Sequence, residues 1–285
     1  MRIDLHTHSS VSDGTDTPTR LVLKALGLGL DVIGLCDHDT FDGIPEAVEA
    51  GKRVGLTVLG GIEMSTKFKG ESVHLLGYGC DPYHRPLVEE LARIRVGRSG
   101  RIEPSVKALN EAGLELTVDD VMDAAQGAPS IGRPHLADAL VAKGYVANRD
   151  AAFAEWLAEG RPGYVERYAT PLPDAIDLIH DAKGAAIIAH PWARHTEQIL
   201  TAPVLERLRN EHGLEGIEVD HEDHDADTRS LLFDMGARLG MIRTGSSDYH
   251  GLGKEGFELG CNLTRKSAYL ELLSRIRARG GVLPG

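Results

Sequence analysis

Cysteine is scarce in this sequence and forms no motif. Cys36, Cys80 and Cys261 are an odd, scattered set within 285 residues and show no Cys-x-x-Cys spacing. This pattern argues against a disulfide framework and against a thiolate zinc site. We therefore expect three reduced thiols, most of them buried.

Long apolar runs and excess positive charge are missing as well. No apolar stretch approaches the ~18 residues that span a membrane, and the N-terminus reads as a strand and not as a signal peptide. We therefore expect a cytoplasmic protein with no membrane partner.

The net charge of -12 argues against binding duplex DNA, which normally relies on a broad basic surface. A small anionic substrate remains compatible, because bound cations make a carboxylate cluster locally less negative.

Histidine is the informative residue. His6 and His8 follow the short apolar strand Arg2–Leu5, and side chains two residues apart on a strand point to the same face. Both imidazoles can therefore reach a single metal ion. Taken alone, such a pair is equally compatible with a polar surface.

Other predicted strands repeat the pattern. Nearly all of them carry a metal-ligand type of residue at or just beyond the C-terminal end. The further candidates are Asp13, in a loop, His74, within its strand, and His38, Glu63, His190, Asp248 and His250. In α/β barrels the C-terminal ends of the strands carry the chemistry. The sequence therefore predicts a metal site in that position.

The chain divides into two kinds of region. Residues 1–94 and 168–285 alternate strands with helices, expected at 18–28, 43–55, 174–183, 202–212, 225–239 and 267–279. This βαβ rhythm predicts an α/β fold with a parallel sheet or barrel. Residues 95–167 read as short helices, at 106–112, 118–125, 134–143 and 149–159, with no convincing strand. Thr117 and Asp120 resemble a capping arrangement, and Pro134 suits a first helical turn. We interpret this region as a helical insertion that caps one end of the barrel.

The ordered set of ligand candidates resembles the PHP family, named for its polymerase-associated and histidinol-phosphatase members. The likeness covers the whole chain and is closest to the stand-alone phosphoesterases that act on nucleotides and on RNA 5' ends. The strings that carry it are DLHTHS at 4–9, SDGT at 12–15, DHDT at 37–40, GIE at 61–63, IGRPH at 131–135, AHP at 189–191 and GSSDYH at 245–250.

The resemblance implies a distorted (β/α)7 TIM-like barrel that holds up to three divalent metals. Carried over position by position, the first metal takes His6, His8, Glu63 and Asp248; the second takes Glu63, His74 and His190; the third takes Asp13, His38 and His250. Mixed nitrogen and oxygen ligands suit Mn²⁺, Fe²⁺ or Zn²⁺. We expect Asp37 and Asp39 to orient ligand histidines, and Cys36 to pack as a small apolar residue.

The expected chemistry is attack on phosphorus by a hydroxide that bridges two metals. Arg133 is the first candidate to contact the phosphoryl oxygens, with His135 beside it at a helix start. His224 could contact the phosphate or protonate the leaving oxygen. Their alternatives are a solvated surface charge for Arg133 and an exposed loop residue for His224.

Three arginines that recur every three residues form a second basic candidate. Arg95, Arg98 and Arg101 could grip a second phosphate, although Gly97, Gly100 and Pro104 weaken the helix there, and a solvated helix face is the alternative. His221 is a weaker candidate than His224. The histidines without a motif, expected to be ordinary surface or core residues, are His84, His180, His195 and His212.

The predicted function is a metal-dependent phosphatase that acts on a nucleoside 5'-monophosphate or 3',5'-bisphosphate, extending to 5'-3' exonuclease action on short RNA. One alternative is histidinol-phosphate phosphatase, whose stand-alone members lack the 131–135 segment. The other is a non-catalytic metal-binding module. Such modules have commonly lost ligands, whereas all nine positions are filled here.

Overall fold

The computed structural model describes residues 1–193 and 196–284, and within them one mixed sheet forms the centre of the molecule. Its strands are β1 (Ile3–Thr7), β2 (Val32–Leu35), β3 (Thr57–Phe68), β4 (Glu71–Tyr78), β5 (Thr170–Pro171), β6 (Ala185–Ile188), β7 (Gly216–Asp220) and β8 (Ile242–Gly245). Their order is β1-β2-β3-β4-β6-β7-β8, with β5 beside β3. Just beyond β8, Tyr249 bridges to Thr7, and its carbonyl accepts a hydrogen bond of 2.8 Å from the His8 amide. The sheet thus closes almost completely, and the predicted distorted α/β barrel is confirmed.

One hairpin departs from the parallel pattern. β4 runs antiparallel to both β3 and β6. Glu63 lies in the middle of β3, opposite Leu76, and His74 lies in the first half of β4, opposite Ser65. The expectation that Glu63 follows its strand is therefore wrong, whereas His74 lies within its strand as the sequence indicates. Because β4 runs backwards, its first half lies where the neighbouring β6 ends, and the His74 carbonyl accepts from the Ala189 amide at 3.0 Å.

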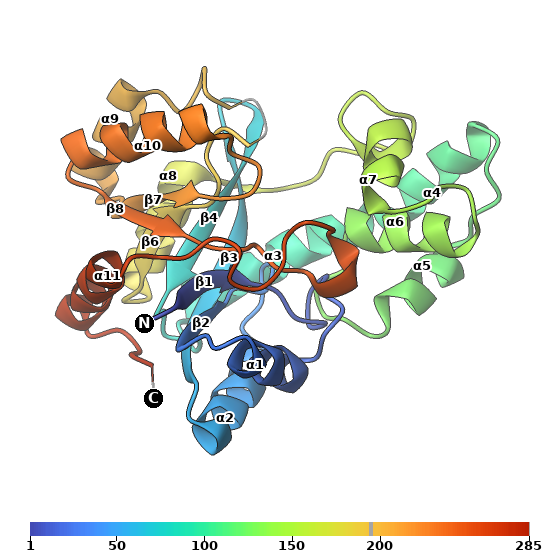
Figure 1. Cartoon of the computed structure of the whole chain (residues 1–285). Helices are drawn as coiled ribbons and strands as arrows, with labels where there is room; N and C mark the ends of the chain where they lie inside the picture. Colours follow the sequence, from blue (N-terminus) through green and yellow to red (C-terminus); the bar gives the residue numbers. More distant parts are fainter. Residues whose placement is uncertain (194–195, 285) are drawn as a thin grey trace.

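Helices cover the outside of the sheet (Figure 1). They are α1 (Pro18–Gly27), α2 (Ile44–Val54), α8 (Leu172–Asp181), α9 (Ala202–His212), α10 (Ala226–Arg238) and α11 (Lys266–Arg279). α1 and α2 pack against β2 residues Ile33 and Leu35. α8, α9 and α10 share a second core with β4 and β6, and α11 packs against a third that contains Ile3 and Ile187. No helix in the described ranges is both long enough and apolar enough for a membrane span.

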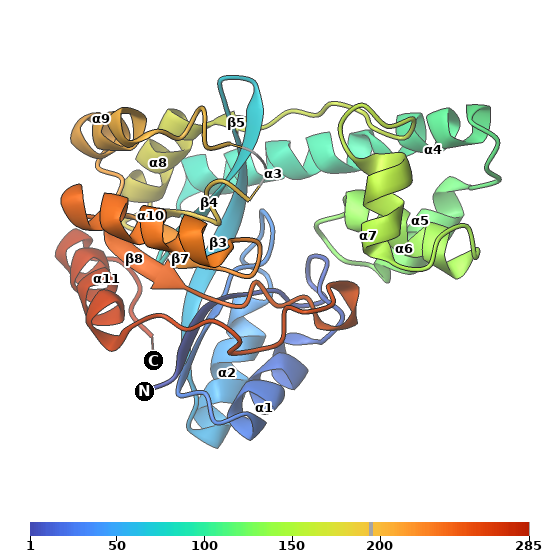
Figure 2. The same cartoon turned by 45° about the horizontal axis from the view of Figure 1, so that its top comes forward.

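The remaining helices form a lobe at the far end of α3, set apart from the sheet in both views (Figures 1 and 2). α3 (Arg85–Gly100) begins in the barrel's core, with Leu87 and Leu91, and leads to the lobe. The lobe consists of α4 (Ile102–Glu111), α5 (Val118–Ala125), α6 (Arg133–Ala142) and α7 (Arg149–Ala152), which continues into a π-helical turn, Phe153–Leu157. The lobe has its own hydrophobic cluster, which runs from Ile102 to Leu157 and includes Leu109 and Leu136. The expected boundary at residue 94 falls inside α3.

Local sequence explains two features of this lobe. Thr117 and Asp120 form the expected capping box at the start of α5. The expectation that glycines weaken the helix near Arg98 is wrong, because Gly97 and Gly100 both lie within α3. At Gly97 a Cβ atom would approach Tyr168 Cβ to 3.2 Å, so the absence of a side chain there permits close packing.

Candidate active site

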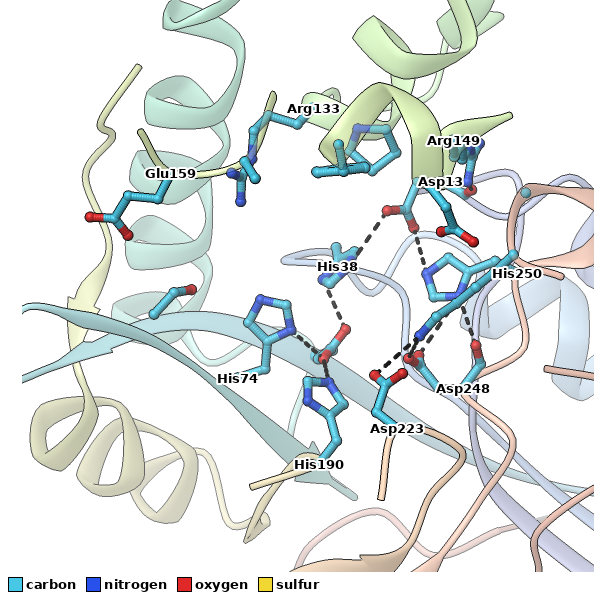
Figure 3. A pocket seen from close by; sticks show the side chains of 18 of the residues that line it. Asp13, His38, His74, Arg133, Arg149, Glu159, His190, Asp223, Asp248 and His250 are labelled. Carbon is cyan, nitrogen blue, oxygen red and sulfur yellow. Dashed lines mark hydrogen bonds and ion pairs between the residues drawn. The ribbon is translucent and has the colours of Figure 1, made fainter. Parts of the chain in front are cut away.

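A cavity of about 520 Å³ lies between the rim of the barrel and the helical lobe. The barrel contributes seven of the predicted ligands to its wall, namely Asp13, His38, Glu63, His74, His190, Asp248 and His250. The lobe contributes Arg133, Arg149, Phe153, Glu159 and Tyr164. Figure 3 shows the two groups facing each other across the cavity. Acidic and imidazole groups thus line one side, and arginines with aromatic rings line the other.

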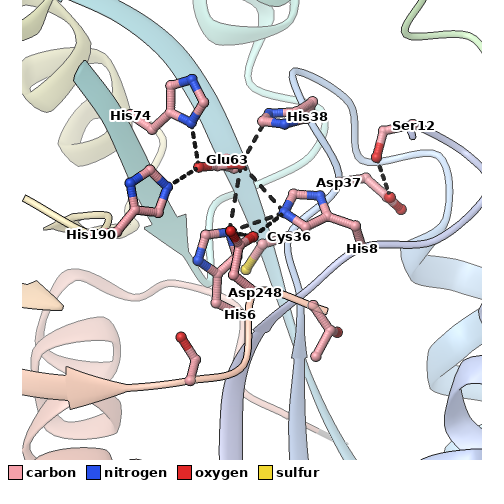
Figure 4. A network of polar contacts seen from close by, with 12 residues as sticks. His6, His8, Ser12, Cys36, Asp37, His38, Glu63, His74, His190 and Asp248 are labelled. Carbon is pink, nitrogen blue, oxygen red and sulfur yellow. Dashed lines mark hydrogen bonds and ion pairs between the residues drawn. The ribbon is translucent and has the colours of Figure 1, made fainter. Parts of the chain in front are cut away.

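His6 and His8 are fully buried and reach the same cluster from β1 (Figure 4). Their Nε2 atoms lie 3.0 Å apart. Asp248 Oδ1 lies 3.4 Å from His6 Nε2 and 3.2 Å from His8 Nε2. Glu63 Oε2 lies 3.5 and 3.3 Å from the same two nitrogens. The alternation along β1 therefore brings both imidazoles to one point.

Glu63 is the centre of the cluster. Its Oε1 lies 2.6 Å from His74 Nδ1 and 3.1 Å from His190 Nε2. Its Oε2 lies 3.0 Å from His38 Nδ1. The antiparallel β3–β4 pairing permits this arrangement, because it places Glu63 and His74 on one face of the hairpin. One carboxylate can therefore join neighbouring metal positions.

A third group lies on the other side of His8. Asp13 Oδ1 is 3.3 Å from His250 Nε2, and Asp13 Oδ2 is 3.6 Å from His38 Nε2. The His8 and His250 rings are stacked, with centroids 4.1 Å apart. The ligand atoms gather into overlapping groups, which are His6, His8, Glu63 and Asp248; His8, Asp13, His38 and His250; His38, Glu63 and His74; and His190, His221 and Asp248.

The chemistry of these atoms fits divalent cations. Several buried ring nitrogens and carboxylate oxygens have no hydrogen-bond partner, namely Nδ1 of His6, His8 and His38 and Oδ1 of Asp13 and Asp248. Buried polar atoms normally have a partner. All of these except His6 Nδ1, which faces Glu218, are placed where they can bind a metal. Bound cations would supply the missing interactions. This donor set suits divalent metal ions.

The pKa values of the clustered histidines and carboxylates depend on one another. Burial alone lowers the pKa of His8, but contacts with Asp248 and Glu63 raise it to about 9. Burial alone raises the pKa of Glu63, but His74 and His38 lower it to well below its usual range. Glu63 therefore stays ionised and favours the protonated form of His8, whereas burial lowers the pKa of His190 to about 4. Metal binding must displace such protons.

Glu218 is a buried site residue that sequence reasoning missed. Its Oε1 lies 3.4 Å from His6 Nδ1 and accepts a short hydrogen bond from Ser246, and its Oε2 accepts from the His190 amide at 2.9 Å. Glu218 thus contacts one ligand directly and the backbone of another. The available signal was a charged residue inside the apolar β7 strand.

Asp37 and Asp39 do not orient histidine rings, so that expectation is wrong. Asp37 accepts hydrogen bonds from the Ser9 amide and from the Ser9 and Ser12 hydroxyls. Asp39 accepts from the amide and hydroxyl of Ser65 and from Arg98. Both carboxylates fix loops that carry ligands.

His221 and Lys254 also approach the cluster. His221 is buried, and its Nε2 lies 3.4 Å from Asp248 Oδ2. Lys254 lines the cavity and donates to the same oxygen at 2.6 Å. His224 is 2% exposed, so the exposed-loop alternative is wrong. Its Nδ1 donates to the Val219 carbonyl at 2.9 Å, and it is not among the residues that line the cavity.

On the lobe side, Arg133 is partly buried in the cavity wall. It donates to the Leu157 carbonyl at 3.0 Å and lies 5.5 and 5.4 Å from the ring centroids of Phe153 and Tyr164. His135 is buried behind it and accepts from the Gly132 amide at 3.1 Å. The sequence analysis did not identify a second arginine of the cavity wall, Arg149. Arg149 lines the cavity and donates to the Asp13 carbonyl at 2.8 Å.

The remaining candidates are structural. His180 pairs with Glu215 and His212 with Asp177, each at 3.0 Å. His195 lies outside the described residues. Cys36 and Cys80 are buried and Cys261 is exposed, and all three are free thiols. The Cys36 thiol donates to the Leu5 carbonyl at 3.4 Å.

An α/β barrel whose rim holds clustered imidazoles and carboxylates, opposite arginines, defines a metal-dependent hydrolase of phosphate esters. Residues 4–122 match the model of the PHP domain. The chain is 34% identical to a 3',5'-nucleoside bisphosphate phosphatase from Chromobacterium violaceum, over 90% of both chains. It is also 34% identical to a 5'-3' exoribonuclease from Haemophilus influenzae, over 87% of this chain and 90% of that one.

A solved structure agrees with these matches. A candidate metal-dependent phosphoesterase from Bifidobacterium adolescentis superposes with a TM-score of 0.91 at 35% identity, covering 96% of each chain. The chain belongs to the PHP family.

Proposed function

We propose that this protein removes a phosphate from a nucleotide, either a nucleoside 5'-monophosphate or a 3',5'-bisphosphate. The observation that carries the proposal is the Glu63-centred cluster facing Arg133, Phe153 and Tyr164 across one cavity. The cluster suits the phosphoryl group, and the aromatic faces suit a nucleobase. The relatives named above support a nucleotide substrate.

Up to three divalent ions would be held by the nine predicted ligands. The groups proposed are His6, His8, Glu63 and Asp248; Glu63, His74 and His190; and Asp13, His38 and His250. Manganese, iron and zinc all suit these donors. When bound, such ions provide a nucleophile at neutral pH and neutralise charge on the phosphoryl oxygens.

The other polar residues of the cavity bind and orient the substrate. Lys254 and Arg133 both line the cavity, where their positive charges can contact non-bridging phosphoryl oxygens. His224, predicted to contact the phosphate or protonate the leaving oxygen, does not line the cavity, so we propose instead that it holds the loop after β7 through its hydrogen bond to the Val219 carbonyl. His135 holds the start of α6 and so positions Arg133.

A second candidate activity is 5'-3' exonuclease action on short RNA. The relative from Haemophilus influenzae favours it, because its identity to this chain equals that of the bisphosphate phosphatase. In this proposal the helical insertion, expected at residues 95–167, acts as the substrate cap. Its shape then decides whether only a nucleotide or also a strand can enter.

Phosphate release from a substrate panel tests the proposal. The panel holds AMP, adenosine 3',5'-bisphosphate, histidinol phosphate and a 5'-phosphorylated short RNA, each with manganese. Turnover of the nucleotides that disappears in Asp248→Ala, and persists in Glu211→Gln on the exposed face of α9, would support it. Protein that holds metal and releases phosphate from none of them would refute it and favour a binding module.

A further inference from the structure

One arginine of the helical lobe reaches across to the barrel. Arg149 begins α7, lines the cavity and lies beside Asp13 in Figure 3. Its Nη1 donates to the Asp13 carbonyl at 2.8 Å, whereas its Nε and Nη2 each donate to the Asp138 carboxylate of α6 at 2.6 Å. The side chain therefore connects two helices of the lobe to a barrel loop that carries a predicted metal ligand.

The ion pair of Arg149 and Asp138 is well fixed and carries no net charge. Two parallel hydrogen bonds join the guanidinium to the carboxylate, which is the strong, bidentate geometry for such a pair. Because Asp138 offsets the positive charge, Arg149 does not oppose a cation bound nearby. The guanidinium also keeps its protons at any working pH, so its hydrogen bond to Asp13 does not depend on pH. These properties suit a structural link between the lobe and the barrel.

The place that Arg149 contacts is the junction of two barrel segments. The loop that carries Asp13 is joined to the segment that carries His250, because the Thr15 amide donates to the His250 carbonyl at 3.1 Å. A Cβ atom at Gly253 would overlap the Arg149 guanidinium, so the second segment passes directly against this side chain. Arg149 therefore contacts both segments at once.

These two segments supply the third group of proposed metal ligands. Asp13 Oδ1 lies 3.3 Å from His250 Nε2, and Asp13 Oδ2 lies 3.6 Å from His38 Nε2. Unlike His6, which lies within β1, Asp13 lies in a turn. The sheet does not fix the backbone of such a residue, so contacts from outside the loop must do so. The hydrogen bond from Arg149 to the Asp13 carbonyl is one of them.

The lobe is also held to the barrel at a second place. Arg98, in the last turn of α3, pairs with Asp39 of the barrel at 3.1 Å. Because α3 leads into the lobe, this contact keeps the lobe attached when the contact at Arg149 is lost. Loss of Arg149 should therefore affect the loop of Asp13 and not the packing of the lobe.

We propose that Arg149 is a positioning residue, which ties the lobe to the segments of Asp13 and His250 and so holds the third ligand group in the geometry that binds a metal ion. The inference rests on the metal groups of the proposed function. It gives the lobe a second task besides capping the substrate, because this ligand group keeps its geometry only while α7 lies against the barrel.

Hydrogen exchange of the metal-free protein tests the link without metal or substrate. Arg149→Met removes all three hydrogen bonds, and Asp138→Asn weakens the ion pair without changing a residue of the cavity wall. We expect the amides of residues 12–15 to exchange about 10- to 100-fold faster in Arg149→Met, as for the loss of a hydrogen bond to a charged group. Asp138→Asn should have a smaller effect of the same kind. Arg161→Met and Asp123→Asn, at exposed positions of the lobe, are the matched controls.

Calorimetric titration of the metal-free proteins with manganese tests the consequence for metal binding. We expect the Kd of one manganese ion to rise by about 10- to 100-fold in Arg149→Met, the range typical of groups that orient ligands. Asp138→Asn should raise the same Kd by a smaller factor, and both control variants should bind manganese as the wild-type protein does. Unchanged exchange or unchanged manganese binding in Arg149→Met would overturn the inference.

Kinetics with AMP separate positioning from direct contact with the substrate. We expect the kcat of Arg149→Met to be low at limiting manganese and to recover in excess manganese, with the KM for AMP unchanged. A KM that stays raised in excess manganese would show that Arg149 binds the substrate and would overturn the positioning role.

The two proposals can fail separately. A protein that hydrolyses no phosphate ester, but whose exchange and manganese binding depend on Arg149, would refute the proposed function and leave the link in place. A protein that hydrolyses nucleotides, and binds manganese equally well as wild type and as Arg149→Met, would do the reverse. Faster exchange throughout α4, α5 and α6 in both Arg149→Met and Asp138→Asn would mean a general loss of folding and would also overturn the inference.

Discussion

Lys254 and Asp248 form a hydrogen-bonded ion pair, with Lys254 Nζ 2.6 Å from Asp248 Oδ2. Asp248 Oδ1 faces His6 and His8 at 3.4 and 3.2 Å. The Lys254 ammonium also lies 3.6 Å from the centroid of the Phe257 ring. One carboxylate therefore joins a cation in the cavity wall to the buried imidazole pair. This relationship places a fixed positive charge beside the metal ligands without using a ligand position.

Replacing Lys254 with methionine should slow the reaction and leave the metals bound. In the proposed role the ammonium stabilises charge on the phosphoryl oxygens, and loss of one such donor typically costs about 10²- to 10³-fold in kcat. Steady-state kinetics and elemental analysis of the same preparation check this. Lys107→Met, on the exposed face of α4, serves as the control. Unchanged kcat, or loss of metal, would contradict the role assigned to Lys254.

Glu218→Gln should weaken metal binding. The glutamine retains an acceptor for the His190 amide but removes the charge 3.4 Å from His6 Nδ1. Changes to groups that orient ligands typically cost about 10- to 100-fold in metal affinity or activity. We expect the manganese concentration for half-maximal activity to rise by that factor, with activity restored by excess metal. If the manganese dependence matches that of wild type, Glu218 has no such role.

Removal of metal should abolish activity and lower the Tm. Bound ions stabilise the folded state in proportion to RT ln(1 + [L]/Kd), which is about 4 kcal/mol at 1,000 times Kd. Without them the buried nitrogens and oxygens of His8, His38 and Asp13 lose their expected partners. Treatment with EDTA, followed by refilling with manganese, iron or zinc, would rank the metals by Tm and turnover. A Tm that EDTA leaves unchanged would argue against metals in this cluster.

Local patterns in the sequence were sufficient for much of the fold. The helix of Ala202–His212 begins and ends where the sequence predicts, because Gly213 adopts a left-handed conformation (φ 75°) that stops it. The pairing of His6 with His8 follows from strand alternation. These features depend on neighbours in the sequence, so a single chain reveals them.

The sequence analysis did not predict that β4 runs antiparallel to β3, although the turn between the two strands is a local feature. Lys69 and Gly70 form a two-residue turn with φ values of 51° and 93°, between the paired residues Phe68 and Glu71. Positive φ at both positions is typical of a tight hairpin. Reading that turn would have predicted an antiparallel β4, and with it the position of Glu63 inside its strand.

Contacts between distant segments could not be predicted in this way. Lys254, Glu218 and Arg149 belong to no motif, and each meets the site only after the barrel closes or the lobe folds over it. The assignment of ligands to individual metals came from family resemblance. The structure shows that neighbouring groups of metal ligands share residues, because His8 lies close to Asp13 as well as to Asp248.

The cap of α5 should make the stability of the lobe depend on acid pH. Asp120 accepts from Lys143 at 2.8 Å and from Thr117, and these contacts lower its pKa from 3.8 to about 2. Because the pKa is lower in the folded state, the contribution is present above about pH 4 and is lost as the pH falls towards 2. Asp120→Asn should therefore reduce the Tm at neutral pH, and the difference in Tm from wild type should shrink as the pH falls through this range.

Asp119→Asn, in the same helical turn, is the matched control. Melting curves of EDTA-treated proteins from pH 7 to 2.5 check this, and a difference that is constant with pH would exclude the ion pair as its cause.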